Sequence, residues 1–214
     1  MKTRALSKRI ISIFLTLLII SSMSVPAFAA KESQPKIDFV ATMQIVSYSG
    51  GGLGSSVGYA GHSFLIFTNT SNSQITVGHF PVGVGEQITI GTFGNRPAHY
   101  GIWYNIEGYR GISSTSYGLL TGVTAGELIV INSKINSLDY WSQVNNCSFF
   151  AREVWNAGNS GKPLSGWNPA NLAASIRNYS GYITSPSIPS KPLSSIARHT
   201  PNGFEYDSSG AYSA

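Results

Sequence analysis

Charged residues and cysteine are the two scarce classes in this chain of 214 residues. Only 11% of the residues are Asp, Glu, Lys or Arg, and there is one cysteine. Low charge together with 23 glycines argues against a helical bundle or a coiled coil. A single cysteine excludes an intramolecular disulfide framework and any zinc site built on paired thiolates. The chain is instead 42% apolar, with ten Phe and eleven Tyr, which excludes a disordered chain and favours a strand-rich globular protein.

Four basic residues stand in the first nine positions without any acidic residue, and an apolar run over residues 10–20 follows them. The sequence Ala27-Phe28-Ala29 then provides a small-residue cleavage site. This order predicts a secretory signal peptide over residues 1–29. The apolar run is short for a membrane span, which needs about 20 residues. We therefore expect signal cleavage, no transmembrane span in the mature chain, and a location outside a bacterial cell or in its envelope.

The basic balance of the whole chain does not describe the mature protein. The formal net charge is +5, but without the four basic residues of the signal the chain holds ten basic and nine acidic residues. A nearly neutral chain lacks the electrostatic footprint of a nucleic-acid-binding protein. We expect no nucleic-acid partner, and a monomer.

The mature chain divides by pattern into a polar leader (30–36), a folded domain (37–180) and a Ser- and Pro-rich C-terminal segment (181–214). We interpret the last as an extended covering segment or a loose tail. Short β-branched and apolar runs separated by Gly, Pro, Asn and Ser predict an antiparallel meander of about five to six strands. The expected strands cover residues 37–48, 62–68, 75–79, 87–92, 101–106 and 127–131.

Helical periodicity begins near Ser133. Apolar residues at every third position predict a short helix over residues 133–144, and the spacing from Cys147 to Trp155 predicts a second helix that ends near Gly158. Asn145 or Asn146 is its expected N-cap. Asn168-Pro169 predicts the start of a third helix. The fold class is thus α+β, an antiparallel sheet packed against two to three helices.

Cys147 is placed at the start of its helix, where backbone N–H groups and the helix dipole stabilise a thiolate. The N–H of Cys147 itself is an expected oxyanion donor. A buried structural cysteine is the alternative, since cysteine is among the most buried residue types. The capped first turn favours a nucleophile.

A nucleophilic cysteine needs a base, and the chain has four histidines. If residues 62–68 and 75–79 form a hairpin with an even-numbered loop, His62 and His79 share one face of the sheet. They would then serve as the base and as the residue that orients it. His99 is expected in a loop and His199 in the tail.

Other sites have weaker support. The glycines between Gly50 and Gly61 lack the Lys-Ser/Thr ending of a phosphate loop, so we interpret them as a mobile loop beside a cleft. No spacing of His, Asp or Glu indicates a metal site, and no cofactor is expected. Glu86, Glu107 and Glu127 are interpreted as surface residues beside strands.

Three segments resemble one enzyme family: residues 61–67 around His62, Val77-Gly78-His79, and residues 145–151 around Cys147. They are similar to the circularly permuted branch of the NlpC-type papain-like thiol enzymes, which includes lecithin retinol acyltransferase-like proteins. The resemblance covers residues 62–158. It implies a permuted papain-like fold with Cys147 as nucleophile, His62 as general base and His79 as polar third member. Ser148 departs from the acidic residue frequent there in the acyltransferase-like members.

The leading hypothesis is an exported thiol hydrolase that cleaves an amide or ester through a thioester, with a cell-wall peptide as substrate. An acyltransferase or lipase-type enzyme would use the same residues. A non-catalytic domain that holds glycan or peptide on Trp103, Tyr104 and Tyr109 is the rival class. The side-chain oxyanion donor stays open among Tyr48, Tyr100, Tyr104 and Tyr140.

Overall fold

The computed structural model describes residues 38–50, 61–94, 101–112 and 115–207. The expected signal peptide and leader lie outside the described residues, as do residues 51–60 of the glycine-rich loop, His99 and Tyr100. The described part holds an eight-stranded sheet, a two-stranded sheet and four α-helices. The α+β class is confirmed, and the main sheet is larger than the expected five to six strands.

The main sheet is antiparallel and has the order β10-β9-β6-β5-β2-β1-β7-β8. Its strands are β1 (Phe39–Tyr48), β2 (His62–Asn69), β5 (Gln87–Phe93), β6 (Gly101–Tyr104), β7 (Ser116–Thr124), β8 (Ile183–Thr184), β9 (Ala197–Thr200) and β10 (Gly203–Tyr206). The small sheet pairs β3 (Ile75–Val77) with β4 (Phe80–Val82).

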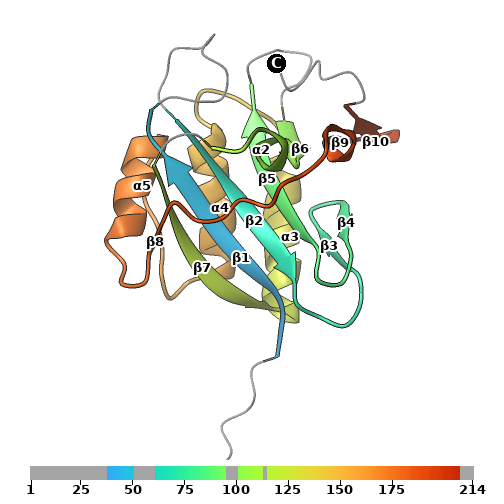
Figure 1. Cartoon of the computed structure of the whole chain (residues 1–214), viewed down its shortest axis with the longest axis horizontal. Helices are drawn as coiled ribbons and strands as arrows, with labels where there is room; N and C mark the ends of the chain where they lie inside the picture. The colour runs from blue at the N-terminus through green and yellow to red at the C-terminus, as the bar shows by residue number, and fades with distance from the viewer. Residues whose placement is uncertain (1–37, 51–60, 95–100, 113–114, 208–214) are drawn as a thin grey trace, which may run out of the picture. The chain divides into compact units, whose positions relative to one another are not determined.

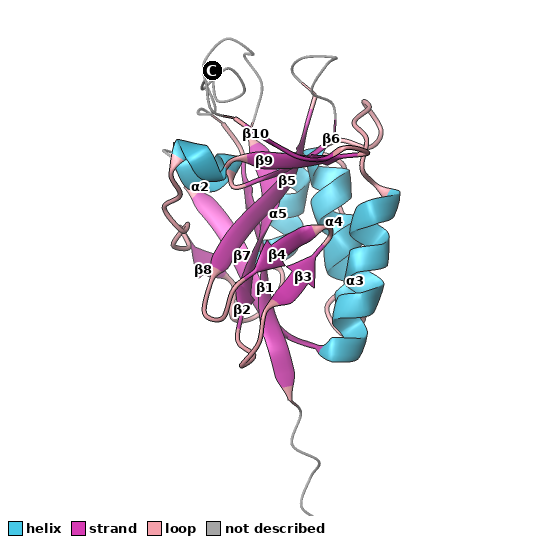
Figure 2. Ribbon diagram, turned by 90° about the vertical axis from the view of Figure 1, so that its right-hand side faces the viewer, coloured by secondary structure: helices cyan, strands magenta, loops and turns pink. Residues whose placement is uncertain are grey.

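The two faces of the main sheet are covered differently. The helices α3 (Ala125–Ser137), α4 (Cys147–Gly158) and α5 (Pro169–Arg177) lie on one face. The short helix α2 (Ile106–Arg110) and the extended segment 185–196 lie on the other, as Figures 1 and 2 show. No helix in the described ranges is long and apolar enough to cross a membrane.

The strand β2 is buried along nearly its whole length because both of its faces are covered. Leu65 and Phe67 belong to the large core shared with α3, α4 and α5. Phe64 and Ile66 alternate with them and join a smaller cluster, against which Ile188 of the extended segment packs. The period of two along the strand therefore places His62 and Ser63 toward opposite faces of the sheet.

The expected strand over residues 127–131 is wrong, because these residues lie within α3. Thr124 and Glu127 form a reciprocal capping box at the start of that helix. Leu128, Ile131 and Ile135 are its buried residues, at helical spacing. The helix expected over residues 133–144 is wrong in its bounds for the same reason, since α3 begins earlier and ends at Ser137.

The expected hairpin between the two histidine strands is also wrong. His62 begins β2, which pairs with β1 and β5, whereas β3 pairs with β4 in the separate small sheet. His79 lies in the turn between β3 and β4. In the sequence, β3 and β4 come between β2 and β5, but in the main sheet β2 pairs directly with β5. Strands that follow one another in the sequence are therefore not all neighbours in the sheet.

Candidate active site

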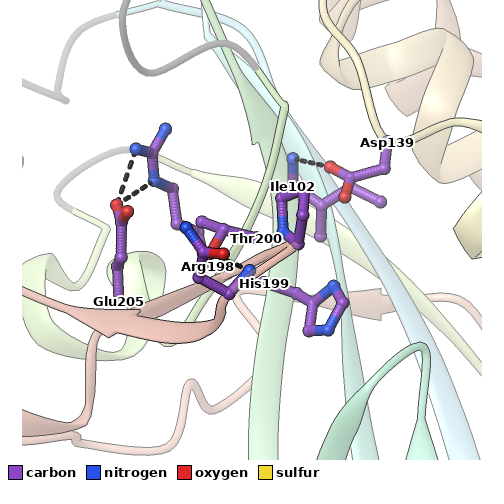
Figure 3. A pocket seen from close by; sticks show the side chains of 8 residues that line it. Ile102, Asp139, Arg198, His199, Thr200 and Glu205 are labelled. Carbon is purple, nitrogen blue, oxygen red and sulfur yellow. Dashed lines mark hydrogen bonds and ion pairs between the residues drawn. The ribbon is translucent and has the colours of Figure 1, made fainter.

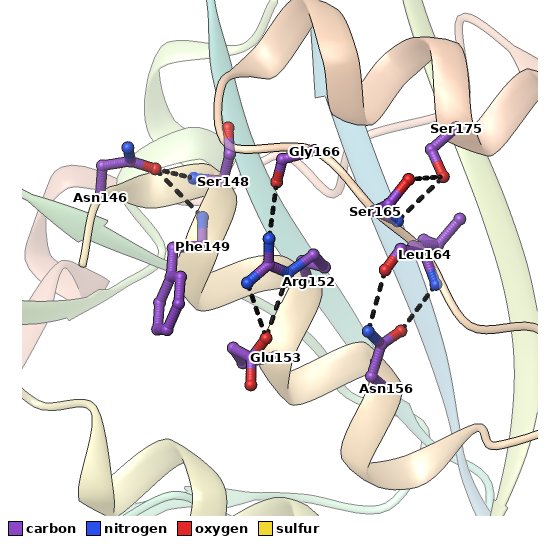
Figure 4. A network of polar contacts seen from close by, with 10 residues as sticks. All are labelled: Asn146, Ser148, Phe149, Arg152, Glu153, Asn156, Leu164, Ser165, Gly166 and Ser175. Atoms are coloured by element: carbon purple, nitrogen blue, oxygen red, sulfur yellow. Dashed lines mark hydrogen bonds and ion pairs between the residues drawn. The ribbon is translucent and has the colours of Figure 1, made fainter. Parts of the chain in front are cut away.

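The helix α4 begins at Cys147 with a side-chain cap. Asn146 Oδ1 accepts hydrogen bonds from the N–H groups of Ser148 and Phe149, each at 3.0 Å (Figure 4). The cap uses two of the free N–H groups of the first turn, and within the described residues no hydrogen bond uses the N–H of Cys147. The sulfur thus lies at a capped helix start, as the sequence predicts, on a partly exposed residue.

His62 lies at the first position of β2, directly opposite Tyr48 of β1. Its ring is held between aromatic neighbours, with ring centroids 4.8 Å from Phe93 and 5.9 Å from Phe64. Nε2 is 2.9 Å from Glu107 Oε1. The charge of Cys147 and a side-chain hydrogen bond with it raise the pKa of His62, so the thiol lies close to the ring. Because Nε2 faces Glu107, Nδ1 is the nitrogen left for the sulfur. The structure therefore brings Cys147 and His62 together.

Glu107 is the site residue that the sequence reasoning missed. It is only 1% exposed, although a surface position was expected for it. The backbone turns at Asn105, which has a positive φ of 67°, and α2 then returns over β5. The apolar run over residues 102–106 resembles a longer strand, so the sequence contains no sign of this turn. Glu107 takes the orienting position that the family resemblance implied for His79.

Two residues of β5, Thr89 and Gly91, determine where the Glu107 carboxylate lies. Thr89 donates a hydrogen bond of 2.7 Å from Oγ1 to Oε2. Gly91 leaves the space beside the ion pair: a Cβ atom there would lie 2.2 Å from Glu107 Oε1 and 3.1 Å from His62 Nε2. A buried carboxylate that is hydrogen bonded on both oxygens holds the imidazole in one orientation.

The charges of the site favour an ion pair of thiolate and imidazolium. Burial lowers the pKa of His62, but the charge of Cys147 and the hydrogen bonds to Cys147 and Glu107 outweigh it and raise the pKa to about 10. Burial raises the pKa of Cys147, but His62 and the backbone N–H of Ser63 outweigh it, and the pKa lies below its ordinary value. The pairing with His62 thus favours the thiolate form of Cys147 over that of a free thiol.

Three buried serine hydroxyls connect α4 with α5 beside the thiol. Ser47 Oγ donates to the carbonyl of Pro169 at 2.8 Å, and Ser63 Oγ lies 2.8 Å from Ser47 and 2.9 Å from Ser148. The carbonyl only accepts, and each hydroxyl has one proton. Ser63 therefore donates to Ser47. Ser148 Oγ lies beside Ser63 Oγ and 4.0 Å from Cys147 Sγ, and together with the Ser63 N–H it lowers the pKa of the thiol.

Of the candidate oxyanion donors among the described residues, Tyr48 lies at the site. Its ring centroid is 6.5 Å from that of His62. Burial, Glu107 and Cys147 all raise the pKa of its phenol, which therefore keeps its proton and can donate it. Tyr104 lies elsewhere, since its hydroxyl accepts the N–H of His79, and Tyr140 is exposed.

His79 does not lie beside His62. Its ring stacks on His199 with the centroids 3.9 Å apart, and burial and His199 lower its pKa. His199 in turn lines a polar groove with Asp139, Arg198 and Glu205, in which Arg198 pairs with Glu205 (Figure 3). The structure thus gives His79 a neighbour in the C-terminal hairpin rather than a place at the thiol.

Two further expectations can be compared with the described residues. No group of three or more His, Cys, Asp or Glu in the described ranges could hold a metal ion. Of the three aromatic residues named for a glycan-binding alternative, Trp103 and Tyr104 are each 1% exposed, and only Tyr109 is exposed. That set does not form a binding surface.

A methyl group at Gly91 is expected to disturb the site more than the fold. In Gly91→Ala the new Cβ must displace the end of the Glu107 side chain, which is flexible, and break its bond to His62. We expect thiol reactivity near neutral pH to fall by about 10-fold, as one lost charge-assisted hydrogen bond would give. The measurement is the second-order rate of iodoacetamide alkylation.

The matched control for this variant is Gly126→Ala in α3, where a Cβ would meet nothing within 4 Å. It should alkylate at the wild-type rate. If Gly91→Ala also alkylates at that rate, Glu107 does not act on His62 as described.

The stability of the protein should have a plateau in pH set by the ion pair. The raised pKa of His62 adds stability that is lost as pH rises from 6.5 through about 10. The lowered pKa of Cys147 adds stability that is complete above 9.0 and is lost as pH falls. Below pH 9.0, over the range in which the folded thiol has lost its proton, the rising contribution of Cys147 offsets the falling contribution of His62. Between about pH 9 and 10 only the His62 contribution changes, so stability falls there. Urea unfolding across pH, with Cys147→Ser as comparison, measures this. A wild-type profile that parallels the variant's would contradict the ion pair.

Comparison with known proteins gives no relative: no family model, no curated protein and no solved structure matches the chain.

Proposed function

We propose that this protein is a thiol hydrolase in which Cys147 attacks the carbonyl carbon of an amide or ester. One observation carries the proposal: His62 contacts Cys147 on one side and the buried carboxylate of Glu107 on the other. Nucleophile, base and orienting acid in one hydrogen-bonded series are the arrangement of covalent acyl-transfer catalysis.

The chemistry follows from the positions of the protons. Cys147 Sγ bonds to the substrate carbonyl, and the oxyanion accepts from the N–H of Cys147 and from the phenol of Tyr48. The imidazolium of His62 gives its Nδ1 proton to the leaving amine or alcohol, and a thioester remains. Neutral His62 then takes a proton from water, the hydroxide attacks the thioester, and the acid leaves as the thiolate returns. Glu107 stabilises the imidazolium throughout and keeps Nε2–H in place.

Because the sequence predicts an export signal, we propose that the protein is secreted or held in the cell envelope. A cell-wall peptide is then the proposed substrate. Acyl transfer to an acceptor other than water uses the same residues and differs only in what attacks the thioester.

Incubation of the purified protein with muropeptides and with fluorogenic acyl esters tests the proposal. The wild type should release product and accumulate, on slow substrates, an adduct whose mass equals the acyl group on Cys147. Cys147→Ala should do neither. Product that contains an added amine or alcohol would indicate transfer. Equal turnover by wild type and Cys147→Ala would contradict the proposal.

A further inference from the structure

The extended segment 185–196, called the strap below, crosses the sheet face opposite α3, α4 and α5 in front of β1 and β2 (Figure 1). It ends in the turn η2 (Leu193–Ser195), and the chain then enters β9. Ile188 of the strap packs on the apolar cluster of Val46, Tyr48, Phe64 and Ile66. Covering this cluster accounts for the first half of the strap but not for the second.

The helix α2, which carries Glu107, has little means of holding its own position. It has five residues, and Asn105 at its start makes no side-chain cap to it. Helices of this length are unstable alone, because nucleation costs more than one or two hydrogen bonds return. Besides the bonds that Thr89 of β5 makes to Asn105 and Glu107, the position of the carboxylate therefore depends on what packs on α2.

The second half of the strap supplies that packing. The N–H of Lys191 donates to the carbonyl of Gly108 at 3.0 Å, and Asn105 Nδ2 donates to the carbonyl of Ser195 at 3.0 Å. Ile196, the last residue of the strap, packs on Ile106 and on Trp103 of β6. The residues on both sides of Glu107 are thus held by one segment from 80 or more positions further along the chain.

The approach at Gly108 is close enough to require glycine. A Cβ atom there would lie 2.7 Å from Lys191 Cγ and 2.8 Å from the carbonyl oxygen of Pro189. The oxygen belongs to the backbone, so the strap or the helix would have to move.

We propose that the strap is a positioning element of the active site, which holds Glu107 against His62 through its contacts with Asn105, Ile106 and Gly108. The inference rests on the proposed function for its catalytic meaning. Its physical content is a link between the strap and the His62–Cys147 ion pair, and this link can be measured without any substrate.

The test compares two variants that loosen different strap contacts. Gly108→Ala pushes on Pro189 and Lys191. Asn105→Gly keeps the positive φ but removes the bond to Ser195 together with the bond that Asn105 Oδ1 accepts from the N–H of Thr89, so Gly108→Ala is the variant that acts on the strap alone. Release of Glu107 lowers the pKa of His62 and so raises that of Cys147. The pH midpoint of Cys147 alkylation should therefore rise in both variants, toward the midpoint of Glu107→Gln. On a turned-over substrate, kcat should fall by about 10-fold with KM unchanged.

Thr200→Val is the control, because Thr200 Oγ1 donates to the carbonyl of Gly203 within the C-terminal hairpin and does not touch α2. It should lower the melting temperature and leave the alkylation midpoint unchanged. If Gly108→Ala and Asn105→Gly lower the melting temperature but keep the wild-type midpoint, the strap only covers the sheet and the inference is wrong. A shifted midpoint in a protein that hydrolyses nothing would retain the inference and refute the proposed function.

Discussion

His62→Ala is expected to lower hydrolysis by roughly 10²–10⁴-fold, the range for loss of a general acid–base group. The variant loses the positive charge that outweighs the effect of burial on Cys147. Its thiol pKa should rise above the ordinary value, and each unit removes about nine-tenths of the thiolate present near neutral pH. The pH dependence of Cys147 alkylation by iodoacetamide measures this directly, because the wild type should react at lower pH than a free thiol and the variant only at higher pH.

His79→Ala is the control for that experiment, since it removes the same side chain from a position where the ring stacks on His199. It should alkylate and hydrolyse at the wild-type rate. Loss of activity in His79→Ala equal to that in His62→Ala would restore His79 as the third member and contradict the assignment of Glu107.

Trp155→Ala is expected to lower the free energy of unfolding by about 3–5 kcal/mol, the usual cost of deleting a buried Trp or Phe side chain. Trp155 is 0% exposed on α4, and its indole N–H donates to the carbonyl of Lys162 at 2.9 Å. The variant leaves a large cavity and an unpaired carbonyl. Domains are stable by only about 5–15 kcal/mol, so this is a large part of the total. Urea unfolding followed by far-ultraviolet circular dichroism measures the difference.

Ile129→Ala on α3 is the matched substitution, because Ile129 is 72% exposed. Its effect should stay within about 0.5 kcal/mol. If Trp155→Ala changes the free energy of unfolding no more than Ile129→Ala does, α4 is not anchored to the core as described.

Local signals in the sequence were enough to place Cys147 at the start of a helix. Asn168 is an N-cap as its position predicts, and of the two candidates Asn145 and Asn146 it is Asn146 that caps α4, which begins at Cys147. Caps are read reliably because the donor and acceptor lie within three residues of each other. The capping box of Thr124 and Glu127 is an equally local signal in the sequence, and it marks the start of α3.

Contacts between segments that are far apart in the sequence have no such local signal. Glu107, the carboxylate partner of His62, lies 45 positions further along the chain and follows a residue of positive φ, Asn105. The space for its carboxylate is left by Gly91, which lies on a third element, β5. Strand parity alone suggested His79, because it assumed that consecutive strands pair. In the structure β3 pairs with β4 in a separate sheet and not with β2, and nothing in the composition of these segments indicates this. Long-range contacts decide the identity of the acid, and a single sequence does not contain them.

The strap also gives the protein an order of assembly. Residues 147 and 62 can meet as soon as α4 has packed on the sheet, but the strap contacts of α2 come from residues 189–196. A chain made from its N-terminus therefore brings Cys147 and His62 together first and completes the packing around Glu107 last. Such late closure of a long loop is slow compared with local folding. Newly made molecules should pass through a folded but weakly reactive stage, and full thiol reactivity would report the arrival of the C-terminal residues.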